Sequence, residues 1–133
     1  MEILNIVVAA LASYMFGAIW YMSLSKPWMA ATGMTEADLK DEDGNAKGGP
    51  TPYIIAFVCA LVVASMMNHV FGLIGVISLV DGLLLGLGIG LFIAAPWTAT
   101  HYSFSNKPRL LILIDAGYSS IGCAIMGFVL MTF

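Results

Sequence analysis

One carboxylate lies inside a long apolar stretch of this chain. From residue 110 to residue 132, Asp115 is the only charged side chain among apolar, small and hydroxyl-bearing residues. An ionised side chain costs roughly 2.5–3.5 kcal/mol at the centre of a bilayer, so such a residue has a partner and often a function. Asp115 is therefore the first candidate for chemistry. It is either a proton or solute site or a hydrogen-bonded node between two helices.

Counting residues from the turn expected before this stretch gives the depth of Asp115. At 1.5 Å per residue, the carboxylate falls about 8 Å inside the apolar core, level with Trp97 and Thr98 of the preceding stretch. His101 and Tyr102 lie about one helical turn closer to the membrane boundary. The candidate partners of Asp115 are Thr98, His101, Tyr118 and the indole N–H of Trp97 or Trp20.

A second group of polar residues is expected at the opposite boundary, where two apolar stretches turn near Gly75. Equal distances from that turn place His69 opposite Asp81, and Asn5 and Asn68 fall at the same end. Because imidazole titrates near neutrality, one interpretation is a proton- or cation-handling pair. The other is that both groups lie among the lipid headgroups and only hold the helical hairpin in place at the membrane boundary.

The chain lacks the familiar catalytic and ligand-binding patterns. It has no glycine-rich phosphate loop, no nucleophile elbow and no His-x3-His or Cys-x2-Cys metal spacing. Cys59 and Cys123 fall at different expected depths, which argues against a disulfide or a shared metal. No basic stripe suggests nucleic acid. We therefore expect no catalytic residue, no metal and no cofactor.

Four apolar stretches are long enough to carry these residues across a membrane. The chain is 60% hydrophobic and 10% charged, whereas soluble domains carry about 25% charged residues. A spanning helix needs about 20 mostly apolar residues. The expected fold is all-α, a compact bundle of four transmembrane helices in a single domain, residues 1–133. The expected spans are residues 3–22, 53–71, 76–99 and 110–132, with a polar connection at 23–52.

Basic residues occur in only two of the connections. Lys26, Lys40 and Lys47 lie in the first, and Lys107 and Arg109 lie in the third. Cytoplasmic loops of membrane proteins carry an excess of Lys and Arg. The sequence therefore predicts that these connections face the cytoplasm and that both termini lie outside.

The connection at residues 23–52 contains signals of its own. Trp20 and Tyr21, just before it, are expected to anchor the first span at the interface. Residues 23–33 are expected to lie on the membrane surface. Thr35 and Asp38 have the spacing of a capping box, which predicts a short cytoplasmic helix at residues 36–40.

Small residues recur at every fourth position in the spans, most clearly as glycines in the third. This spacing places them on one helix face and lets two backbones approach closely. The contact is either packing within one bundle or association with another protein or a second copy. The expected packing positions are Gly17, Gly82, Gly86, Gly90, Ser120 and Gly127.

One short pattern occurs twice. Tyr-x4-Lys-Pro begins at Tyr21 and again at Tyr102, each time at the inner end of an odd-numbered span. One interpretation is a duplicated helical hairpin, the parallel kind of repeat found in some transporters. The other is that the pattern reflects only the composition of a membrane boundary.

Several local motifs occur together along nearly the whole chain. They are Gly17-Ala-Ile-Trp20-Tyr21, Trp28-Met29, Gly33-Met-Thr35-Glu36-x-Asp38-Leu39, Pro96, Lys107-Pro108, Leu113-Ile-Asp115-Ala-Gly117-Tyr118 and Met126-Gly127. In this combination the chain resembles a bacterial family of small four-helix membrane proteins that is labelled only as a domain of unknown function. The resemblance implies the topology above and a place in the bacterial inner membrane. In the family pattern the position of Asp115 is often Asn, which implies hydrogen bonding there and not charge.

Three functions are compatible with these patterns. We favour a packing or accessory subunit of a membrane complex, or a homo-oligomer, because every span has a small-residue face. The alternative is a small transporter or channel that uses Asp81, His69 and Asp115 for proton or cation coupling. A membrane enzyme acting on lipid or quinone ranks last. The expected partners are the lipid bilayer and a membrane protein or a second copy of the chain, and no nucleic acid.

Overall fold

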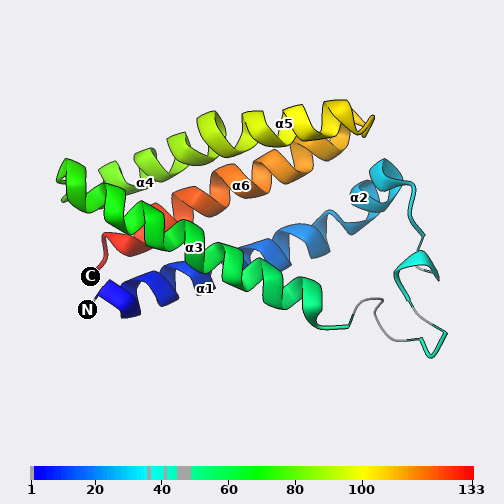
Figure 1. Ribbon diagram of the computed structural model, residues 1–133, viewed down its shortest axis with the longest axis horizontal. Helices are drawn as coiled ribbons and strands as arrows, with labels where there is room; N and C mark the ends of the chain where they lie inside the picture. Colours follow the sequence, from blue (N-terminus) through cyan, green and yellow to red (C-terminus); the bar gives the residue numbers. More distant parts are fainter. Residues whose placement is uncertain (1, 36, 41, 45–48) are drawn as a thin grey trace.

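The structure, a computed structural model, describes residues 2–35, 37–40, 42–44 and 49–133 (Figure 1). Every regular element in this part of the chain is a helix. The elements are, in order, α1 (Glu2–Ser23), α2 (Ser25–Thr32), the 3₁₀-helix η1 (Ala37–Leu39), α3 (Thr51–Ile74), α4 (Leu79–Ile89), the π-helix η2 (Gly90–Ala94), α5 (Ala95–Phe104) and α6 (Arg109–Leu130).

Four helical segments are long and apolar enough to cross a membrane: α1, α3, the continuous segment α4–η2–α5, and α6. This confirms the predicted all-α fold with four spans. The third span begins at Leu79 and continues to Phe104, later at both ends than the predicted residues 76–99. Its start is fixed by Ser78, whose hydroxyl oxygen accepts a hydrogen bond from the Asp81 N–H at 3.0 Å, as a helix N-cap does.

Two short turns lie near the positions expected from the sequence. Helix α3 ends at Ile74 and is followed by its C-cap Gly75, whose φ of 76° is a left-handed conformation that glycine adopts without steric cost. Asn106, with a φ of 58°, takes a similar conformation between α5 and α6. Because both turns are short, the helices that they join run antiparallel.

The connection between α1 and α3 is more helical than expected. Residues 25–32 form α2, which packs against α1 and α6. The Thr35 N–H donates to Asp38 Oδ2 at 2.9 Å and the Asp38 N–H donates to Thr35 Oγ1 at 3.4 Å, which is a reciprocal capping box. The helix that follows is the 3₁₀-helix η1, shorter than the predicted residues 36–40. Position 36 itself lies outside the described residues.

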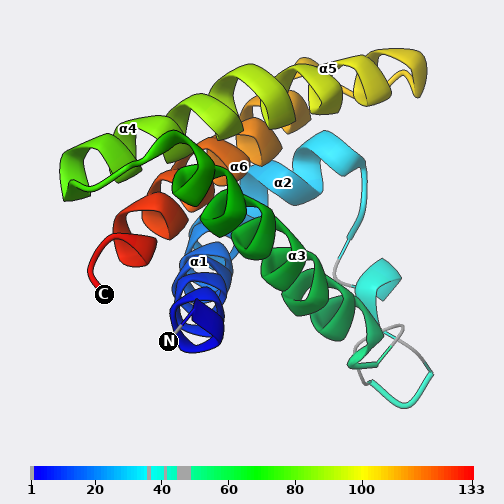
Figure 2. The ribbon, with the colours of Figure 1, turned by 60° about the vertical axis from the view of Figure 1, so that its left-hand side comes forward.

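Helix α6 is the central element of the fold. It packs against α1 and against α4, η2 and α5, whereas α3 packs mainly against α1 (Figures 1 and 2). Near the α3–α4 turn, Met67 and Phe71 of α3 are buried with Met126 and Leu130 of α6. Both chain termini lie at this end of the molecule, which we call the terminal end (Figure 1).

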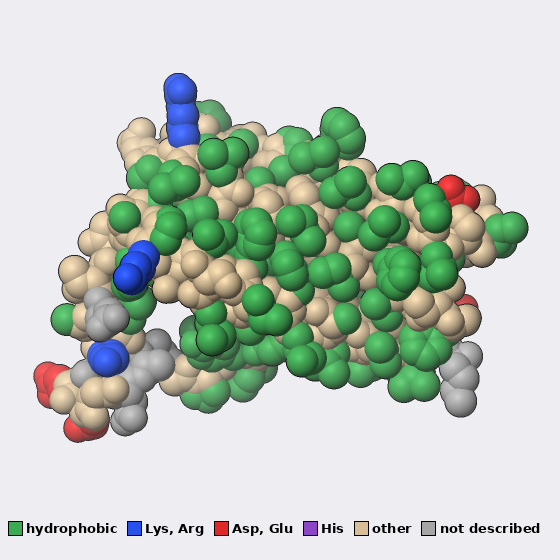
Figure 3. All heavy atoms as spheres, turned by 180° about the vertical axis from the view of Figure 1, so that it is seen from behind, with side chains coloured by type: hydrophobic (Ala, Val, Ile, Leu, Met, Phe, Trp, Pro, Cys, Tyr) green, Lys and Arg blue, Asp and Glu red, His purple; other side chains and the backbone are tan. Residues whose placement is uncertain are grey.

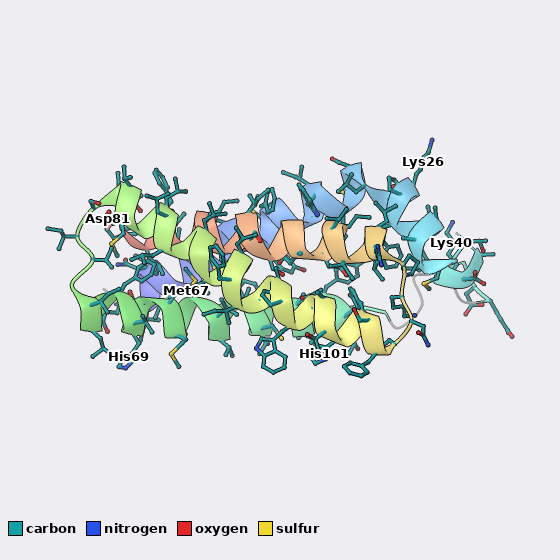
Figure 4. The ribbon with its side chains drawn as sticks, turned by 90° about the horizontal axis from the view of Figure 1, so that it is seen from above. Lys26, Lys40, Met67, His69, Asp81 and His101 are labelled. Carbon is teal, nitrogen blue, oxygen red and sulfur yellow. The ribbon has the colours of Figure 1, made fainter. Side chains whose placement is uncertain are left out.

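The outer surface has the charge distribution of a multi-pass membrane protein. Apolar side chains cover the middle of the face seen in Figure 3, and Lys and Arg appear only toward one end of it. Lys26 and Lys40 lie at the end opposite His69 and Asp81 (Figure 4). We call the end with Lys26 and Lys40, where the α5–α6 turn also lies, the basic end.

Glycines bring α4 and α6 into backbone contact. A Cβ added to Gly86 would lie 2.2 Å from the Cys123 carbonyl oxygen, and one added to Gly82 would lie 2.5 Å from the Gly127 carbonyl oxygen. These distances leave no room for a side chain, so the contact requires glycine. We call it the glycine seam; it comprises Gly82, Gly86 and Gly90 on one side and Ser119, Ser120, Cys123 and Gly127 on the other. The seam lies within one chain, so these glycines pack inside the bundle.

Candidate functional site

Asp115 lies where three helices meet. Its Oδ1 accepts a hydrogen bond from the Tyr21 hydroxyl of α1 at 2.5 Å, and its Oδ2 accepts one from the Tyr102 hydroxyl of α5. The ring of Tyr21 packs edge-on against Tyr118 of α6, with the ring centroids 5.4 Å apart. We call Asp115, Tyr21 and Tyr102 the tyrosine–aspartate cluster. Because each carboxylate oxygen has a donor from a different helix, the cluster joins α1 and α5 to α6.

The end of α1 is held against α6 by a further hydrogen bond and by two glycine–aromatic contacts. Trp20 Nε1 donates to the Ile114 carbonyl oxygen at 2.9 Å. A Cβ added to Gly117 would lie 2.7 Å from Trp20 Cζ2, and one added to Gly17 would lie 2.7 Å from Tyr118 Cε1. Each helix therefore supplies a glycine against which an aromatic ring of the other helix packs. These contacts bring the neighbouring Tyr21 within reach of Asp115.

The structure pairs Asp115 with residues outside the set of partners expected from the sequence. Thr98 donates back to the Ala94 carbonyl oxygen of its own helix at 3.0 Å. His101 is exposed and stacks on the exposed ring of Trp97, with the ring centroids 6.0 Å apart. Both rings therefore face outward. Tyr118 and Trp20 lie beside the cluster but bond to other groups or pack as rings.

The π-helical turn η2 explains why Tyr102 faces α6. A π-helix bonds each N–H to the carbonyl five residues back, and the Ala95 N–H bonds the Gly90 carbonyl in this way. The turn contains one residue more than an α-helix would need, which rotates later residues by about 100° around the axis. An unbroken α-helix continuing the glycine seam would turn His101 toward α6, and the extra residue turns Tyr102 there. Pro96, which has no N–H to donate, is the second residue after the turn.

The repeated Tyr-x4-Lys-Pro pattern was the sequence signal for this cluster. Both of its tyrosines, Tyr21 and Tyr102, donate to the same carboxylate. Each lies near the end of a helix that flanks α6, so the two hydroxyls reach Asp115 from two sides. Residue depth alone does not identify this pair.

The residues expected at the terminal end do not form a cluster. His69 and Asp81 are both exposed and share no hydrogen bond or ion pair in the described structure. They lie at the same end of the molecule but on opposite flanks (Figure 4). Asn68 is half-buried, and Asn5 Oδ1 is buried without a hydrogen-bond partner among the described residues.

The tyrosine–aspartate cluster is made of one carboxylate and neutral donors. Within the described ranges, Asp115 forms no ion pair with a Lys, Arg or His. In the same residues, no three His, Cys, Asp or Glu side chains gather as a metal site would require. Beside Gly90 in the glycine seam, Ser120 keeps a buried hydroxyl without a hydrogen-bond partner in the described part of the chain. The arrangement can hold three helices together.

One of three comparisons with known proteins supports the family resemblance inferred from the sequence motifs. Neither the curated proteins nor the solved structures contain a match to this chain. A family model described as "Protein of unknown function (DUF1761)" matches residues 4–131, nearly the whole chain. The chain therefore belongs to the DUF1761 family of proteins of unknown function.

Proposed function

We propose that this protein is a non-catalytic membrane component that acts by association, as a small subunit of a larger membrane complex or as a homo-oligomer. The observation that carries the proposal is that Asp115 is fully engaged by its own chain. Tyr21 and Tyr102, from two other helices, each donate to one of its carboxylate oxygens. The acid inside the fourth span thereby serves to join helices.

The surface supports the same proposal. Helix α3 packs mainly against α1, and its opposite face is exposed. That face carries His69, a polar side chain inside a segment long enough to cross a membrane. Lipid tails offer an imidazole no hydrogen-bond partner, whereas another protein can offer one.

Mild detergent extraction followed by native mass measurement tests association directly. We expect a discrete particle heavier than one chain, with either a second copy or a stoichiometric partner. Asp115→Asn should leave that particle intact. The amide oxygen still accepts from one tyrosine, and the amide N–H can donate to the hydroxyl oxygen of the other. Recovery of the unaltered protein only as a lone chain would contradict the proposal.

A small transporter or channel with proton or cation coupling is the second candidate. It is favoured by the neutral surroundings of Asp115, whose described neighbours include no basic partner that would fix its charge. Proton flux into vesicles containing the purified protein separates the two functions. If Asp115→Asn abolished such a flux while folding and assembly stayed normal, the structural role of Asp115 would give way to a coupling role.

A further inference from the structure

Three exposed basic residues lie at the basic end, outside the loop between α2 and α3. Lys26 belongs to α2, Lys107 lies in the α5–α6 turn and Arg109 begins α6. None of the three forms an ion pair with another residue of the described chain. The negative charges that balance them therefore come from their surroundings.

The fold brings these basic residues to one level of the molecule. The Trp20 indole N–H donates to the Ile114 carbonyl oxygen at 2.9 Å, which aligns the end of α1 with α6. From that bond, α6 extends back to its first residue, Arg109, about 8 Å along the helix axis toward the basic end. Helix α1 ends at Ser23, and α2, which carries Lys26, then packs against α6. Lys26 is therefore held beside the first turns of α6, although it is far from Arg109 in the sequence.

The tryptophans indicate that this level is the boundary between lipid tails and headgroups. All three in the chain, Trp20, Trp28 and Trp97, lie in the half of the molecule that ends at the basic end. Tryptophan is enriched at membrane boundaries because its ring is apolar and its N–H is polar. Trp20 lies about 8 Å deeper than Arg109 along the bundle. The basic residues above it therefore reach the lipid phosphates.

The terminal end has the opposite chemistry. Glu2 and Asp81 are exposed there, and the described residues at that end include no Lys or Arg (Figures 3 and 4). An anionic headgroup is attracted to the basic end and repelled from the terminal end. A negatively charged lipid therefore has a partner on this protein in one leaflet only.

We propose that the start of α6 and the neighbouring α2 bind anionic phospholipids through Lys26, Lys107 and Arg109. An Arg side chain can donate two parallel hydrogen bonds to a phosphate, whereas Lys attracts it as a point charge. Each Lys or Arg near an anionic bilayer surface strengthens the attraction about fivefold. This lipid contact does not depend on whether the chain associates with another protein.

Native mass measurement of the protein, taken from micelles with equal amounts of phosphatidylglycerol and phosphatidylcholine, tests this contact. The first headgroup is anionic and the second has no net charge, so we expect phosphatidylglycerol to be retained preferentially. Lys26→Gln, Lys107→Gln and Arg109→Gln should each lower this preference about fivefold. Arg109→Lys keeps the charge and should keep most of the preference. Equal retention of the two lipids by the unaltered protein would overturn the proposal.

Lys40→Gln is the matched control, because it removes one exposed basic charge at the same end of the molecule. Lys40 directly follows η1, outside both α2 and α6, so this variant should keep the lipid preference. A loss as large as that of Arg109→Gln would show that net charge alone attracts the lipid and would overturn the assignment to these residues.

Inorganic phosphate distinguishes a lipid headgroup from a free anion. Added at constant ionic strength, it should leave the bound phosphatidylglycerol in place. Displacement of the lipid by phosphate would show a site for a free anion and would overturn the choice of a phospholipid. Recovery of a lone chain that still prefers phosphatidylglycerol would contradict the proposed association and leave the lipid contact standing.

Discussion

Asp115 illustrates how an ionisable side chain can be kept inside a membrane helix without a counter-charge. Its two oxygens accept from Tyr21 and Tyr102. Both carboxylate oxygens therefore have a partner within the chain and neither is left unsatisfied. A side-chain hydrogen bond contributes about 0.5–1.5 kcal/mol. The same bonds connect the ends of two helices to a third.

Removing either hydroxyl should weaken the bundle, but only while the carboxylate is present. We expect Tyr21→Phe and Tyr102→Phe each to lower the free energy of unfolding by about 0.5–1.5 kcal/mol, because each removes one side-chain hydrogen bond to Asp115. In an Asp115→Leu background the same changes should have almost no effect, since no acceptor remains. Unfolding titrations in mixed micelles measure the four corners of each double-mutant cycle. If the Tyr→Phe changes lowered stability by the same amount with and without Asp115, the tyrosine–aspartate cluster would be contradicted.

The acid could be identified from the sequence, and its partners could not. A lone carboxylate in an apolar run can be read directly from the sequence, and counting residues from the nearest turn gives the depth at which it lies. Partner choice depends instead on how each helix is rotated about its axis. The π-turn η2 changes that rotation by one residue, and only Pro96 marks its position in the sequence. The predicted set therefore included His101 and Thr98, whereas the side chain of the same helical segment that reaches Asp115 is Tyr102.

At the level of elements, the approach of α4 to α6 depends on particular glycines and not on glycine content. A Cβ added to Gly86 would lie 2.2 Å from the Cys123 carbonyl oxygen, whereas one added to Gly88 would meet no atom within 4 Å. The two positions lie in the same helix, two residues apart. They therefore form a matched pair.

Alanine at these two positions should have opposite effects. Gly86→Ala should destabilise the protein by about 1–3 kcal/mol, because the helices must separate to relieve the contact with backbone. Gly88→Ala should be neutral or stabilising by up to about 1 kcal/mol, because alanine favours a helix more than glycine does. Unfolding titrations of both variants under one set of conditions check the difference. The same loss of stability in both would remove the glycine seam as the cause of the close approach.

The π-turn η2 should be removable without moving Tyr102 away from Asp115. Deleting the exposed Phe92 converts the turn to α-helix and keeps the rotation of the residues on either side. Pro96→Ala in the same variant supplies the N–H that an unbroken helix needs. We expect this variant to fold and to keep the cost of Tyr102→Phe measured in the unaltered chain.

Deleting the exposed Thr100 from α5 is the matched control. It removes a residue between the glycine seam and Tyr102 where the helix is regular, so it should turn Tyr102 away from α6 and abolish the effect of Tyr102→Phe. If both deletions behaved alike in the unfolding titration, the π-turn would not be what sets the rotation of α5.

At the scale of the whole molecule, length and hydropathy determine the four spans but not how they meet. The spans were predicted to within a few residues because each is a predominantly apolar run, and turn residues such as Gly75 and Asn106 bound some of them. Helix α3 packs mainly against α1 and little against its neighbour in sequence, α4. Apolar patterning alone does not indicate this, because faces turned toward lipid are as apolar as faces turned toward protein.

The charge distribution predicts which side of the membrane each end of the molecule faces. Lys26 and Lys40 lie at the basic end, where Lys107 and Arg109 flank the α5–α6 turn, and both termini lie at the other end. Since loops rich in Lys and Arg stay in the cytoplasm, we expect the basic end inside and the termini outside.

Labelling of single cysteines in intact cells measures this orientation. In the Cys59→Ser, Cys123→Ser background, a membrane-impermeant thiol reagent should label Glu2→Cys in intact cells and Ser105→Cys only after permeabilisation. Both positions are exposed, one at each end of the molecule, so a difference in labelling reports sidedness and not burial. The reverse pattern would invert the topology and would place the tyrosine–aspartate cluster in the outer half of the membrane. Labelling of both positions in intact cells would instead indicate that the chain inserts in two orientations, as expected if so few basic residues bias insertion only weakly.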